Sequence, residues 1–171
     1  MNRLNAHQVA LLGILTAVLL GGQLALAVVP NGEIISLLVI LYTLLLGRQV
    51  FMVLYAFVFL EGCLFGFHLW WVSYLYIWSL LAGIVLILRR KEQSSLFWAI
   101  VSGFFGLAFG ALCALPYLIT GGPAAALSYW LAGLGFDLVH CAGNFLICLL
   151  LFQPLYRLLS RLLRRYGWPH R

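Results

Sequence analysis

Long apolar runs follow one another along most of this chain, with only short polar breaks between them. A helix needs about 20 apolar residues to cross the hydrocarbon core of a bilayer. Only 8% of the residues are charged, whereas a soluble domain carries about 25%, so the chain could not build a water-facing surface. The sequence therefore predicts an all-α integral membrane protein surrounded by the lipid bilayer. The predicted helices span approximately residues 8–29, 33–47, 49–67, 70–88, 95–119 and 126–153, in a single domain 1–171 that ends in a short basic tail, 154–171.

The breaks between these runs contain proline, glycine or charged residues, all of which favour the end of a helix. They are Pro30–Gly32, Gly47–Gln49, Arg89–Glu92 and Thr120–Pro123. The second run is short, so the alternative is one long helix that contains Arg48 and a total of five spans.

The distribution of basic residues favours six spans over five. With six spans and a cytoplasmic N-terminus, all 10 Lys and Arg residues fall on the cytoplasmic side, as the positive-inside rule expects. With five spans, Arg48 lies in lipid and Arg3 lies on the opposite side from the C-terminus. We therefore predict a six-transmembrane-helix bundle in the plasma membrane with both termini in the cytoplasm. Basic residues at the ends of apolar runs are typical of topology signals and anionic headgroup contacts, so we expect no nucleic acid partner.

Two predicted helices carry small residues spaced about four apart, which gives each a smooth face that another backbone can approach closely. The residues are Gly13, Ala17, Gly21 and Ala25 in the first helix, and Gly106, Gly110 and Ala114 in the fifth. Each face could pack within the bundle or against a partner protein. Gly13, Ala17 and Gly21 are our candidate partner contacts.

Three of the four acidic residues, Glu33, Glu61 and Asp137, are predicted in the outer half of the membrane or at its edge. Ionisable groups at this depth are costly and usually face a cavity or each other. Aromatic walls with a few polar groups are typical of a small-molecule pocket, and acids favour a solute with cationic or hydrogen-bond-donor groups. The candidate substrate-binding residues are Glu33, Glu61, His68, Trp70, Tyr74, Trp130, Asp137, His140 and Asn144, of which the last three share one helix face by their spacing.

Each of these residues also has a structural interpretation. Glu33 could complement the N-terminus of the second helix, and the tryptophans could belong to an interfacial belt. Asp137 and His140 could satisfy each other. A metal could in principle bind Glu61, His68, Asp137 and His140, but their spacing matches no metal-ligand motif, so we predict no metal and no cofactor.

Motifs for catalysis are missing from the sequence. The single lysine, Lys91, is preceded by Arg90 and followed by Glu92, whereas a P-loop requires G-K-[ST]. Neither G-x-S-x-G nor H-E-x-x-H occurs. We therefore expect a binding protein rather than an enzyme, with any ATP hydrolysis performed by partner subunits.

Three stretches resemble the substrate-binding S components of energy-coupling factor (ECF) transporters. They are Pro30–Ser36, the glycine-rich segment Gly103–Pro116, and the segment from Gly135 through Asp137, His140 and Asn144 to Phe145. The resemblance implies a six-helix bundle that captures a vitamin or related micronutrient from outside. It also implies docking on a shared transmembrane coupling protein with two ABC-type ATPases, followed by tipping in the membrane to release the solute. In that family an A-x-x-x-A pattern on the first helix contacts the coupling protein, and Gly13, Ala17 and Gly21 match it with glycine in place of some alanines.

The alternative function belongs to another class, a small membrane scaffold of the MreD cell-shape type, which has a related architecture. A scaffold has little use for acids in the outer half of the membrane. The cluster of Glu61, Asp137 and His140 therefore favours the transport subunit.

Overall fold

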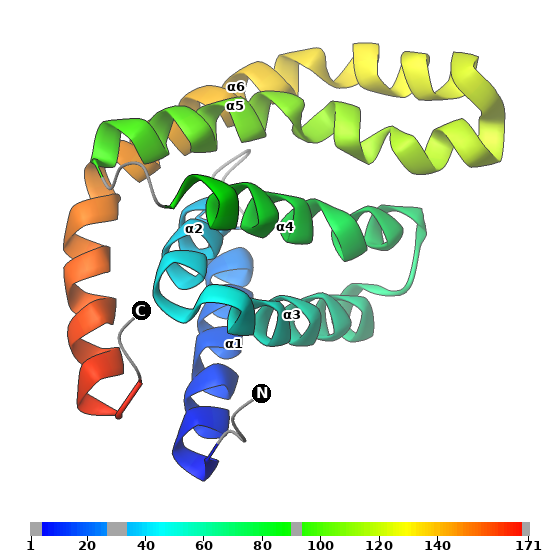
Figure 1. The fold of residues 1–171 in the computed structure, drawn as a ribbon. Coiled ribbons are helices and arrows are strands. Elements are labelled where there is room, and N and C mark those ends of the chain that lie inside the picture. Colours follow the sequence, from blue (N-terminus) through cyan, green and yellow to red (C-terminus); the bar gives the residue numbers. More distant parts are fainter. Residues whose placement is uncertain (1–4, 27–33, 90–93, 169–171) are drawn as a thin grey trace.

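A computed structural model of the protein describes residues 5–26, 34–89 and 94–168, and within these ranges the only regular secondary structure is helical (Figure 1). This confirms the predicted all-α class. In chain order the elements are α1 (Ala6–Leu26), α2 (Ile35–Leu46), the 3-10 turn η1 (Gly47–Gln49), α3 (Val50–Phe65), α4 (Leu69–Leu88), α5 (Ser95–Cys113) and α6 (Leu115–Arg165).

Five helical stretches of the described chain are long and apolar enough to cross a membrane. They are Ala6–Leu26, Ile35–Phe65, Leu69–Leu88, Ser95–Cys113 and Leu115–Arg165. The second stretch combines α2, η1 and α3, for which the sequence predicts two spans. α2 has 12 residues and is therefore about 18 Å long, less than the roughly 30 Å of a hydrocarbon core. The count of six spans and the orientation of the termini stay predictions.

The chain changes direction between α2 and α3, as predicted from Gly47, Arg48 and Gln49 (Figure 1). Gly47 has a φ of 61°, a backbone conformation that favours glycine because it has no Cβ. A second such glycine, Gly66 with a φ of 90°, ends α3. The start of α5 is set differently, because the side chain of Ser94 accepts a hydrogen bond from the Phe97 amide (3.2 Å) and so caps the helix.

α5 and the part of α6 that follows Gly122 form a long antiparallel hairpin, in which residues 115–121 of α6 continue the direction of α5 (Figure 1). The sequence predicts a break between helices at residues 120–123. In the structure the break is a single residue, Gly122 (φ 77°, ψ −178°), which is the one non-helical residue inside α6. The predicted end at residue 153 is also displaced. α6 continues through Pro154 to Arg165, so most of the basic tail is helical.

α6 changes direction between its yellow and red parts in Figure 1. Pro154 lies inside the helix, where its ring blocks the carbonyl four residues earlier and removes one backbone donor, a frequent cause of kinks. The helix then ends in a Schellman motif. The Trp168 amide donates to the Leu163 carbonyl (2.9 Å) and the Gly167 amide to the Arg164 carbonyl (3.1 Å).

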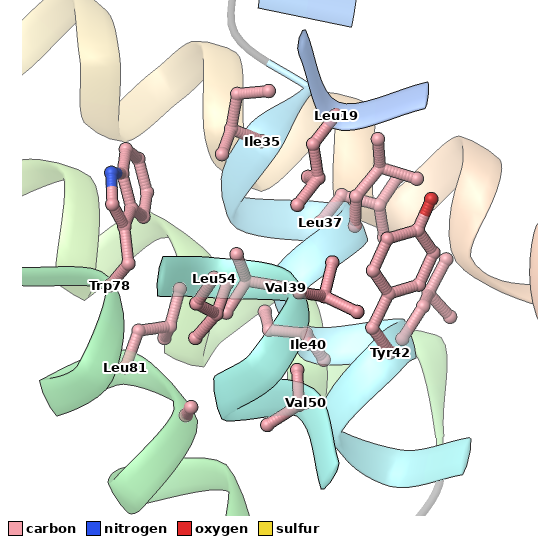
Figure 2. Packing of buried hydrophobic residues seen from close by; sticks show 14 of the residues in the cluster. Leu19, Ile35, Leu37, Val39, Ile40, Tyr42, Val50, Leu54, Trp78 and Leu81 are labelled. Atoms are coloured by element: carbon pink, nitrogen blue, oxygen red, sulfur yellow. The ribbon is translucent and has the colours of Figure 1, made fainter. Parts of the chain in front are cut away.

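The core is centred on α2, which is buried on nearly all sides. Figure 2 shows side chains of α1, α3 and α4 in one cluster with those of α2: Leu19 lies beside Leu37 and Leu54 near Ile40, while Trp78 lies farther out, near Leu81. In a bilayer the surrounding lipid is as apolar as these side chains. Their contribution to stability therefore comes from close packing rather than from removal of water.

Candidate functional site

Asp137, His140 and Asn144 share one face of α6, as their spacing predicted, and this face is buried. Their side chains are exposed by only 4%, 8% and 2%. These residues lie against the glycines of α5. α5 therefore covers this side of α6, which is not the open wall of a pocket.

The contact between α5 and α6 is very close at the glycines. A Cβ added at Gly106 would lie 2.9 Å from the His140 carbonyl oxygen and 3.0 Å from Asn144 Nδ2. A Cβ at Gly110 would collide with the Asp137 carboxylate. The predicted small-residue face of the fifth helix is thus a packing surface within the bundle.

Hydrogen bonds tie these polar groups to two other helices. The Gly110 amide of α5 donates to Asp137 Oδ1 (2.9 Å), and Asn144 Nδ2 donates to Ser36 Oγ of α2 (3.2 Å). The His140 ring packs edge-on against Phe109, with 4.9 Å between ring centroids. We call Ser36, Asp137, His140 and Asn144 the polar seam. It joins α2, α5 and α6 in the interior.

Glu61 belongs to another part of the molecule. It lies on α3, which packs mainly against α1 and α4, whereas α6 packs mainly against α5 and α2. The side chain is only 2% exposed, and its Oε1 has no hydrogen-bond partner among the described residues. The structure therefore does not join Glu61 to the polar seam, contrary to the single cluster that the sequence suggested.

α3 and α4 approach each other closely beside Glu61. The Trp71 indole donates to the Val58 carbonyl (2.8 Å), and a Cβ at Gly62 would lie 2.7 Å from Trp71 Nε1. His68 is exposed in the connection between the two helices, with its ring against Gly66. The four-residue distance from Glu61 to the end of α3 at Phe65 keeps Glu61 near this connection.

The predicted aromatic residues occupy two separate places. Trp70 and Tyr74 are half-buried on α4 and continue inward to Trp78, with edge-on contacts of 5.2 and 5.5 Å between ring centroids. Trp130 of α6 is 37% exposed and lines a shallow groove of about 240 Å³. The other groove residues are Ala111, Ala114, Leu115, Leu118, Ala126 and Leu127, so no charged group lines it.

The remaining predictions concern Glu33 and metals. Glu33 lies outside the described residues. Within residues 5–26, 34–89 and 94–168, no three His, Cys, Asp or Glu side chains come close enough together to hold a metal ion.

The small residues of α1 face away from the bundle. Gly13, Ala17 and Gly21 are exposed, and no atom would lie within 4 Å of a Cβ added at either glycine. The opposite side of α1 is buried through Leu11, Leu12, Leu15, Thr16 and Leu19. The two small-residue faces therefore differ: the face on α5 is packed against α6, whereas the face on α1 is exposed.

Sequence reasoning missed two features that depend on distant parts of the chain. Ser36 is bonded to Asn144, which is 108 positions away. Arg48 and Arg89 line one cleft at the end of the bundle. No spacing rule connects such residues, although the positions of Gly106, Gly110 and Ala114, four apart, did indicate a close helix contact. No protein-family model matches the sequence, and neither the search of curated proteins nor that of solved structures found a match.

Proposed function

We propose that this protein is a membrane-embedded, substrate-binding subunit of an ECF-type importer. It captures a vitamin-like solute from outside and docks on a transmembrane coupling protein driven by two ABC-type ATPases. The observation that carries the proposal is the free small-residue face of α1, because a subunit without a motor needs a surface for its partner.

The α1 face has the features of a helix-docking surface. Gly13, Ala17 and Gly21 lie on one side without large side chains over them, while the leucines of the other side anchor α1 to its own bundle. Small residues let a second helix approach to backbone contact, which is the main source of helix association in lipid.

The solute site in this proposal centres on Glu61 rather than on the polar seam. Asn144 and Asp137 Oδ1 already have partners within the bundle. The other Asp137 oxygen, Oδ2, is also buried without a hydrogen-bond partner among the described residues, but it lies against Gly110 in the closed contact between α5 and α6. Glu61 is a buried carboxyl group with an unpartnered oxygen, and such a group is costly unless it is satisfied. A cationic or hydrogen-bond-donating solute that enters at the connection between α3 and α4, which carries His68, would supply the missing partner.

The α1 face is tested by affinity purification of the tagged chain from its native membranes. We expect a coupling membrane protein and two ABC-type ATPases to co-purify with the original chain. Ala17→Leu places a large side chain on the docking face and should lower their recovery by about tenfold or more. The matched control is Val18→Leu, which changes an exposed, already large neighbour (47% exposed) and should leave recovery unchanged. Equal recovery with both variants would refute docking through this face.

A second candidate, the MreD-type scaffold, is favoured by the closed polar seam. The hydrogen bonds that link Asp137 to α5 and Asn144 to α2 are consistent with a purely structural role. Co-purification of cell-shape proteins without any ATPase would favour this candidate. Growth of a deletion strain separates the two independently, since a transporter predicts vitamin auxotrophy and a scaffold predicts rounded cells.

A further inference from the structure

A cleft with two arginines opens at the end of the bundle where α2 turns into α3. It has a volume of about 360 Å³ and is lined by Arg48, Leu86, Ile87 and Arg89. Arg48 comes from η1, and the other three residues form the last turn of α4 and its C-cap. Figure 1 shows the cyan turn of η1 near this end of α4.

The backbone keeps Arg48 at the surface. Gly47, with its φ of 61°, ends α2 and begins the 3-10 turn, so Arg48 is exposed rather than buried within a continuous helix. Arg89 is half-exposed at the C-terminal end of α4, where its amide bonds to the Val85 carbonyl (2.8 Å).

No acid on the lining elements neutralises the two arginines. η1 and α4 contain neither Asp nor Glu. Within the described residues the acids are Glu61 and Asp137, and neither lines the cleft. Two guanidinium groups that share one cleft, with no carboxylate among the described residues of its walls, form a favourable site for an oxyanion, because arginine presents a planar set of donors that matches phosphate.

The apolar part of the lining distinguishes a lipid from a free anion. Ile87 is 76% exposed beside the arginines, and Leu86 is half-buried. Both α4 and the stretch Ile35–Phe65 are apolar enough to cross a membrane. The last turn of α4 lies at one end of its stretch, where the headgroups of a bilayer that α4 spans would lie. A phospholipid offers both matching parts, a phosphate for the arginines and acyl chains for Ile87.

We propose that this cleft binds the phosphate group of an anionic phospholipid, with Arg48 and Arg89 as the ligands. Four further arginines, Arg157, Arg161, Arg164 and Arg165, lie on the end of α6, and no acid follows Asp137 in the sequence. This charge attracts anionic lipid to the surface in general, while the cleft provides the specific site. The site is separate from the α1 face, so its test does not depend on the proposed transport role.

The experiment measures lipid binding to the purified full chain by native mass spectrometry. Phosphatidylglycerol and phosphatidylcholine with identical acyl chains are added separately. We expect phosphatidylglycerol to bind about tenfold more tightly. The double variant Arg48→Gln/Arg89→Gln should lose this preference and keep the weak binding of phosphatidylcholine. Arg161→Gln/Arg165→Gln is the matched control, since it also removes two positive charges, from exposed arginines outside the cleft, and should keep the preference.

Two outcomes would overturn the proposal. An equal loss in Arg161→Gln/Arg165→Gln and in Arg48→Gln/Arg89→Gln would mean that the preference comes from total charge rather than from the cleft. Displacement of phosphatidylglycerol by inorganic phosphate, beyond the effect of sodium chloride at equal ionic strength, would assign the site to a free anion instead of a lipid.

Discussion

Individual residues control the contact between α5 and α6 through their size. Because Gly106 and Gly110 have no side chain, the backbone of His140 and the side chains of Asn144 and Asp137 can pack directly against α5. The short distances also allow the bond from the Gly110 amide to Asp137. Size and hydrogen bonding therefore depend on each other at this contact.

Gly106→Ala tests the size requirement. The added Cβ would meet backbone at 2.9 Å, which cannot move as a flexible side chain can, so the helices must separate. We expect a loss of about 1–3 kcal/mol of stability, measured as a lower Tm of the purified protein in detergent. The control is Gly133→Ala in α6, where the added Cβ meets nothing within 4 Å. It should keep or raise the Tm, because alanine favours helix over glycine. Equal Tm values for the two variants would contradict the close contact between α5 and α6 at Gly106.

Among the elements, α6 departs most from a simple transmembrane helix. Its first residues, 115–121, continue the direction of α5 up to the break at Gly122. The returning half of the hairpin follows, and beyond Pro154 the element ends as a basic helix. The break lets the chain reverse after α5, which brings Asp137, His140 and Asn144 opposite the glycines. The polar seam thus depends on a turn that contains none of its members.

Gly122→Ala tests the turn. The combination of φ 77° and ψ −178° belongs to a region that essentially only glycine occupies. The substitution should cost about 1–3 kcal/mol, seen as a lower Tm in detergent although no atom lies within 4 Å of the new Cβ. Gly135→Ala, which has the same free space at an ordinary helical conformation, should cause no loss. If Gly122→Ala is equally neutral, the turn does not have this conformation.

At the scale of the whole molecule, the two ends of α4 differ in charge. The α2–α3 turn and the end of α4 carry Arg48 and Arg89, whereas the connection between α3 and α4 carries no Lys or Arg. The same connection holds His68 and lies near Glu61. The charged end and the proposed solute-binding end are therefore at opposite ends of α4.

The positive-inside rule predicts which end faces the cytoplasm. In a background without native cysteines, Phe67→Cys (57% exposed) should react with a membrane-impermeant maleimide in intact cells, and Tyr166→Cys (54% exposed) should react only after permeabilisation. The opposite pattern would place the basic end outside and would refute both the predicted orientation and an outward solute site. Labelling of both positions in intact cells would refute the separation of the two ends by a membrane.

The helices could be predicted from the sequence because their causes are local. The apolar runs and the breaks at Gly47 and Gly122 depend on residues a few positions apart. The shared face of Asp137, His140 and Asn144 follows from helical spacing alone. The extension of α6 beyond Pro154 was missed, because proline disfavours a helix interior and yet is tolerated here with a bend.

What only the tertiary structure decided is which face meets which partner. α1 and α5 carry small residues at similar spacing, but the glycines of α5 are closed by α6 while those of α1 stay free. Glu61 and Asp137 were predicted in one cluster and lie in different helix contacts. Similarly, Arg48 and Arg89 share a cleft although 41 positions separate them. The physical reason is that helical periodicity determines the faces of each helix within a few turns. The neighbour of each face is instead chosen by packing among helices that are distant in the chain.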